Sequence, residues 1–136
     1  MSQLDACYGR AKPLPPGYLD TLGIPSGSSA AQFYSEYSGP FCSRNTAFIL
    51  LDVGDPALDE SVERATLSIR AMFGWPARYL VISDVLAHSV LVYDTTSDSV
   101  FDVDFEGGDL LLVSGNLPAS FATFNDFLAW YFPSES

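Results

Sequence analysis

The hydrophobic pattern of this chain changes its period near Arg78, and this change constrains the fold more than any other feature. Upstream, residues 56–73 repeat apolar side chains at helical spacing, with Asp55 and Pro56 placed to start the helix. Downstream, three short segments have the composition and period of strands: residues 78–82, 89–93 and 99–105. Residues 94–98 have the length and turn-forming composition of a hairpin loop. A long helix followed by hairpin-linked strands predicts an antiparallel sheet.

Other segments complete the predicted fold. Apolar stripes predict helices over residues 14–24, 30–37 and 118–132, and apolar runs predict a buried strand over 46–53 and a fourth hairpin strand over 109–114. The order predicts an α+β fold: an antiparallel sheet of about four or more strands, packed on one side by helices, with a C-terminal amphipathic helix. Residues 1–13 are expected to form a partly mobile arm, and residues 14–136 a single domain.

The strand predicted over residues 99–105 alternates most clearly. One face carries the apolar side chains Phe101, Val103 and Phe105. The opposite face, extended by one residue, carries the carboxylates Asp102, Asp104 and Glu106, spaced about 6.8 Å apart by the strand repeat. We expect the apolar face to pack against helices and the acidic face to meet solvent or a partner.

Charge is distributed very unevenly along the chain. No lysine or arginine follows Arg78, and the formal net charge is −11. Too few cations remain for direct nucleic-acid binding or for binding an anionic membrane. Six of the later acids cluster: Asp94, Asp98, Asp102, Asp104, Glu106 and Asp109. A second patch comprises Asp59, Glu60 and Glu63. Solubility alone would account for such charge; a basic protein partner is the functional alternative.

Catalytic and metal-binding patterns are weak. His88 is the single histidine, and the nearby Ser83 and Asp84 lack the glycines of a nucleophile elbow. Asp102, Asp104, Glu106 and Gly107 match the start of a calcium-binding EF-hand loop, but Val113 stands where the bidentate glutamate belongs. We therefore predict no catalytic residue, no metal and no cofactor. With two cysteines and no apolar secretory or membrane-spanning run, a cytoplasmic location is expected.

The order of motifs resembles the SUKH superfamily of Smi/Knr-type proteins across residues 14–132. An early Leu-Pro–Tyr helix corresponds to Leu14-Pro15 and Tyr18, and the short aromatic helix ending in glycine to residues 33–39. The proline-hydrophobic strand corresponds to Pro76 and residues 79–82, and the aspartate-turn hairpin to residues 93–101. The closing helix of the family matches Ala119, Ser120, Phe121, Phe124, Phe127, Leu128 and Tyr131.

This resemblance implies an α+β fold and a binding role without shared catalytic residues. Many bacterial members are similar to cytoplasmic immunity proteins that neutralise a cognate toxin, often a nuclease. Other members regulate fungal cell walls or associate with a bacterial secretion channel. The sequence therefore predicts an immunity protein that binds its toxin through the acidic residues above. The alternatives are a cytoplasmic regulatory or scaffold protein with a non-toxin partner, and a small hydrolase using His88 or paired acids.

Overall fold

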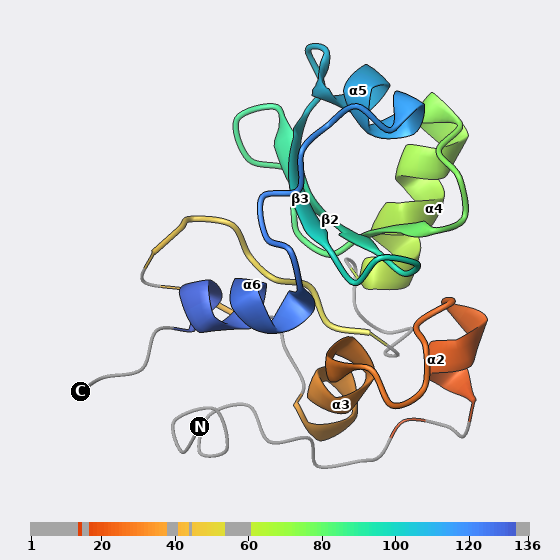
Figure 1. The fold of residues 1–136 in the computed structure, drawn as a ribbon, viewed down its shortest axis with the longest axis vertical. Coiled ribbons are helices and arrows are strands. Elements are labelled where there is room, and N and C mark those ends of the chain that lie inside the picture. The colour runs from red at the N-terminus through yellow and green to blue at the C-terminus, as the bar shows by residue number, and fades with distance from the viewer. Residues whose placement is uncertain (1–13, 15–16, 38–40, 44, 54–60, 133–136) are drawn as a thin grey trace.

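The computed structural model describes residues 14, 17–37, 41–43, 45–53 and 61–132. Its helices and strands follow in the order α2 (Tyr18–Thr21), α3 (Ser29–Glu36), α4 (Val62–Phe73), β1 (Tyr79–Val81), β2 (Ser89–Asp94), β3 (Val100–Asp104), α5 (Gly108–Ser114) and α6 (Phe124–Tyr131). Helices α4 and α5 lie on one side of the sheet, and α3 and α6 lie on the other (Figure 1). The α+β class is thus confirmed. The arm predicted over residues 1–13 lies outside the described residues.

The three strands form an antiparallel sheet in the order β1-β2-β3. Tyr79 pairs with Asp94 at one end of β1–β2, and Ser89 pairs with Asp104 at the far end of β2–β3. The predicted hairpin loop joins β2 to β3, closed by a hydrogen bond from the Asp98 N–H to the Asp94 carbonyl at 2.9 Å. The strand predictions for the three segments are confirmed, each within one residue at either end of the observed strand.

Helices cover both faces of the sheet, which corrects the prediction of helices on one side, and β1 and β2 are buried on both faces while β3 exposes Asp102 and Asp104. In β2, Val90 and Val92 face α4 and α5, whereas Leu91 and Tyr93 face α3 and α6. All four side chains are at most 2% exposed. A strand buried on both sides loses its polar alternation, as β2 does, so its sequence carries no signal for a solvent face.

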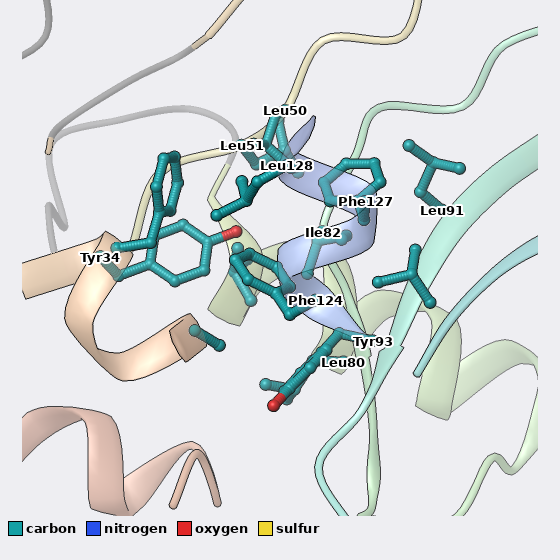
Figure 2. Packing of buried hydrophobic residues seen from close by; sticks show 14 of the residues in the cluster. Tyr34, Leu50, Leu51, Leu80, Ile82, Leu91, Tyr93, Phe124, Phe127 and Leu128 are labelled. Carbon is teal, nitrogen blue, oxygen red and sulfur yellow. The ribbon is translucent and has the colours of Figure 1, made fainter. Parts of the chain in front are cut away.

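The larger core lies between the sheet, α3 and α6. Figure 2 shows Tyr34 of α3 facing Phe124 of α6, with Tyr93, Leu80 and Ile82 of the sheet region around them. The Tyr93 and Phe124 rings meet edge to face, 5.3 Å apart at 78°, a geometry that aromatic quadrupoles favour. This packing explains why so many aromatic residues occur in the N-terminal and C-terminal helices.

The smaller core lies between the sheet, α4 and α5. Ile69 of α4 and Leu112 of α5 pack with Val90, Val92 and Val103. Two polar contacts fix the helices to the edge strand β1. The Thr66 hydroxyl accepts a hydrogen bond from the Val81 N–H at 2.8 Å, and the Tyr79 hydroxyl donates to the Leu112 carbonyl at 3.1 Å.

Several predicted boundaries are wrong. Residues 109–114 form helix α5 rather than a fourth strand, so the described residues form three strands and not four or more. The buried segment 46–53 makes isolated bridges at Leu50, to Phe41 and to Ser83, without becoming a strand. Helix α4 begins at Val62, capped by the Ser61 hydroxyl, and the predicted start at residues 55–60 falls outside the described residues. Helix α6 begins at Phe124, capped by Thr123, and not at residue 118 as predicted, because residues 120 and 121 bond to Val100 of β3.

Candidate functional site: an acidic rim beside helix α5

The exposed carboxylates of the predicted cluster lie on β3 and in the turn after it. Along this strand Phe101 and Val103 are buried, while Asp102 and Asp104 are exposed. Glu106, in the turn that follows, is exposed as well. None of the three carboxylates forms an ion pair with any described residue. We call Asp102, Asp104 and Glu106 the acidic rim.

The backbone of Asp102 lies on the outer edge of the sheet. Its N–H donates to the Ser120 hydroxyl at 3.1 Å, where residues 120 and 121 run along β3 and bond to Val100. Partial burial, and then repulsion from the neighbouring Asp104, raises the pKa of Asp102. Asp102 and Asp104 therefore lie close enough for their charges to repel. A cation placed against the rim would relieve that repulsion.

Asp104 also positions the first turn of α5. Its Oδ1 accepts hydrogen bonds from the Glu106 N–H at 3.0 Å and from the Gly108 N–H at 3.2 Å. A Cβ atom at Gly108 would lie 2.7 Å from Asp104 Oδ2, so a larger residue at this position would have to displace the carboxylate. Asp104 thus bonds directly to the start of α5, so the strand end and the helix form one surface.

Asp94, the first of the six clustered acids, is buried and paired inside the fold. Its side chain is 1% exposed and accepts hydrogen bonds from Arg78 Nε at 3.2 Å, from Arg78 Nη2, and from the Thr96 N–H at 2.9 Å. Burial by itself would raise the pKa of Asp94, but the bonds from Arg78 and Thr96 outweigh it and lower the pKa to about 2. Its charge stabilises the hairpin instead of facing a partner.

Asp98 and Asp109 also serve the fold. Asp98 has a positive φ of 65°, accepts a hydrogen bond from the Tyr93 hydroxyl at 2.8 Å, and lies 3.4 Å from the Phe124 N–H, which donates to it. It therefore connects the hairpin to the start of α6. Asp109 is 9% exposed, and its carboxylate accepts from the Gly107 N–H at 3.3 Å. The structure thus separates the predicted cluster into three exposed carboxylates, of which Asp104 also positions α5, and three less exposed carboxylates that hold local structure.

The second predicted patch is described in part. Glu63 is exposed on the first turn of α4 and accepts a hydrogen bond from the Tyr18 hydroxyl at 3.2 Å. Asp59 and Glu60 lie outside the described residues. Glu63 is separated from the acidic rim by the length of α4, whose C-terminal end lies near α5 (Figure 1).

His88 occupies an exposed tight turn. Ala87 and His88 both have positive φ values, 51° and 65°, and the turn is closed by reciprocal hydrogen bonds between Leu86 and Ser89. A cavity of about 200 Å³ lies elsewhere, between α2 and α4, and His88 is not among the residues that line it. Within the described residues, no group of three or more His, Cys, Asp or Glu side chains is placed to hold a metal ion.

The structure adds exposed apolar residues that the sequence-based prediction missed. On α5, Leu110 is 72% exposed, Leu111 is 46% exposed and Val113 is 48% exposed. On the last turn of α4, Met72 is 68% exposed and Phe73 is 41% exposed. A helical assignment of residues 108–114 would have found the α5 set, because Leu112 alone of its large side chains points to the core.

A scan of the chain against protein-family models finds no match, and searches of curated proteins and of solved structures find none either. Among the described helices, none has both the length and the apolar character needed to cross a membrane.

Proposed function

We propose that this chain is an immunity protein that binds and neutralises a cognate bacterial toxin domain. The order of its motifs resembles the SUKH superfamily, in which such proteins are common, and we assign the chain to that superfamily as part of this proposal. The toxin would be a nuclease or another protein with a basic groove, since a nuclease needs cations to hold phosphate. The immunity protein would act in the cytoplasm, without a cofactor and without catalysis of its own.

The observation that supports this proposal most directly is the acidic rim. Its three carboxylates are exposed, lie on one strand end and the turn after it, and form no ion pair with a described residue. The chain holds no lysine or arginine beyond Arg78 that could neutralise them from the same half of the sequence. A surface of this kind attracts a basic protein, accelerates its association and disfavours acidic partners.

The test compares charge reversals inside and outside the rim. Asp102→Lys and Glu36→Lys change the net charge equally, and both residues are exposed, but Glu36 lies on α3. The association rate with the toxin domain encoded by the adjacent gene is measured at low and high salt. We expect Asp102→Lys to slow association about tenfold at low salt and Glu36→Lys to change it much less.

Equal effects of the two reversals would remove the rim from the interface. Absence of binding by the wild-type protein, together with no rescue of cells that express the toxin domain, would reject the immunity assignment. The alternative, a cytoplasmic regulatory or scaffold protein, would then gain support from a cell-envelope or regulatory gene in the adjacent position.

A further inference from the structure

Helix α5 presents its apolar side chains to solvent, the reverse of an ordinary surface helix. Leu110 and Val113 are one turn apart and therefore adjacent on the helix surface, with Leu111 beside them. Only Leu112 among the four large aliphatic residues of α5 is buried, at 1% exposed. We call Leu110, Leu111 and Val113 the α5 patch. Contiguous exposed aliphatic side chains of this kind mark interaction sites in soluble proteins.

The α5 patch and the acidic rim are parts of one surface. Asp104 of the rim accepts the Gly108 N–H at the start of α5, two residues before Leu110. The other end of α5 is held by Gly115, which has a φ of 80° and donates to the Leu112 carbonyl at 3.1 Å. With both ends bonded, the helix keeps the patch in a fixed position beside the carboxylates.

The C-terminal end of α4 extends this surface. Phe73 stacks on Phe105, the residue between Asp104 and Glu106, with ring centroids 5.0 Å apart and an interplanar angle of 13°. Met72 precedes Phe73 and is more exposed than it. Helix α5 and this end of α4 lie at the same end of the molecule (Figure 1). Apolar side chains therefore adjoin the acidic rim from two elements.

We propose that the α5 patch is the apolar centre of the interface with the toxin domain and that the acidic rim is its charged edge. This inference rests on the proposed function. The fitting partner carries an apolar contact surrounded by lysine or arginine. An apolar centre supplies affinity through slow dissociation, while a charged edge acts mainly on the association rate.

The charge of the surface excludes a second copy of this chain as the favoured occupant. Two-fold pairing through the α5 patch would bring two acidic rims together in molecules that each carry a net charge of −11. Like charges placed opposite each other disfavour such pairing, whereas a basic partner gains from the same carboxylates.

The test uses two matched leucine substitutions. Leu110→Ser lies in the patch, and Leu67→Ser changes a leucine that is 57% exposed on α4, outside the patch. Because both side chains are exposed, both variants should melt close to the wild type. Association and dissociation rates are measured with the toxin domain of the adjacent gene. We expect Leu110→Ser to raise the dissociation rate about tenfold with little change in association, and Leu67→Ser to leave both rates unchanged.

The possible results distinguish a failure of the patch proposal from a failure of the proposed immunity function. If the wild type binds the toxin domain and Leu110→Ser dissociates at the wild-type rate, the patch is not in the interface and the immunity function stands. If the wild type does not bind, both proposals fail. Sedimentation of the free protein as a dimer that Leu110→Ser converts to a monomer would show that a second copy covers the patch, and would overturn the inference.

Discussion

Asp94→Asn should lower the stability of the protein without removing a residue of the proposed interface. The substitution keeps the size of the side chain and removes the charge that Arg78 binds. The pKa of Asp94 falls from an ordinary 3.8 to about 2 in the fold, and each pKa unit corresponds to about 1.4 kcal/mol. Because Arg78 is 46% exposed, solvent weakens the pair, and we expect a loss of about 1–2 kcal/mol at pH 7. The melting temperature should fall by about 4–8 °C.

The lowered pKa of Asp94 determines how the stability difference between the wild type and Asp94→Asn changes with pH. A carboxyl group with a lowered pKa in the native state contributes its full stabilisation above its unfolded pKa, and loses it as the pH falls through the folded value. The wild type should therefore exceed Asp94→Asn in stability at pH 7, and the gap should close between about pH 4 and pH 2. Asp102→Asn is the matched control. The pKa of Asp102 is raised, so removal of its charge should leave stability at pH 7 unchanged or slightly higher.

Urea unfolding followed by tryptophan fluorescence measures both variants across this pH range. Arg78→Met completes a double-mutant cycle, whose coupling energy should be about 1 kcal/mol at pH 7 and close to zero at pH 2. A destabilisation by Asp94→Asn that is equal at pH 7 and pH 2.5 would refute the argument, since it would then come from packing and not from charge.

Two further substitutions test the packing of the fold. Tyr131→Phe removes a buried hydroxyl that lies 3.0 Å from the Leu50 nitrogen, 2.7 Å from the Phe41 carbonyl oxygen and 2.8 Å from the Phe48 carbonyl oxygen. Calorimetry should show that the free energy of unfolding falls by about 1–3 kcal/mol. A fall below about 0.5 kcal/mol would contradict a stabilising role for this hydroxyl. Ala87→Gly should raise the melting temperature by a few degrees, because the left-handed conformation of Ala87 costs a non-glycine residue about 1 kcal/mol. Ala122 does not have a positive φ, so the control Ala122→Gly should lower the melting temperature.

Local patterns in the sequence were sufficient to predict the three strands of the sheet, but not their number, because a fourth strand was predicted as well. Segments of period two or of continuous apolar character, separated by turn residues, predicted the three observed strands and the hairpin between β2 and β3. Short apolar runs were not sufficient to assign residues 46–53 and 109–114, which were predicted as strands. Residues 110–113 read Leu-Leu-Leu-Val, which suits a buried strand or a helix equally. The flanking glycines at 107, 108 and 115 decide in favour of the helix, because two of them adopt positive φ at its ends.

The candidate site could be predicted in part for a similar reason. Alternation along residues 101–106 correctly placed the acidic rim on the outside, since period two depends only on the strand itself. The burial of Asp94 depends on a residue sixteen positions earlier. Antiparallel pairing of β1 with β2 places Tyr79 opposite Asp94, and Arg78 therefore beside it, so only the register of these two strands, which was not predicted, reveals this ion pair. The burial of Asp109 followed from the unpredicted helix.

In the described part of the chain, two of the three arginines bond inside the fold, and none pairs with the acidic rim. Of the described basic residues, Arg78 is bound to Asp94, and Arg70 donates through Nη2 to the Ala77 and Tyr79 carbonyls. Arg64 is exposed on α4, on the N-terminal half of that helix. The chain supplies no lysine or arginine after Arg78, so solvent ions or a basic partner would relieve the repulsion between Asp102 and Asp104. Solvent ions screen such charges without specificity, whereas a partner that also fits the α5 patch gains both the charge relief and the apolar contact. The two features at one end of the molecule therefore favour a basic protein with an apolar contact more than either feature would alone.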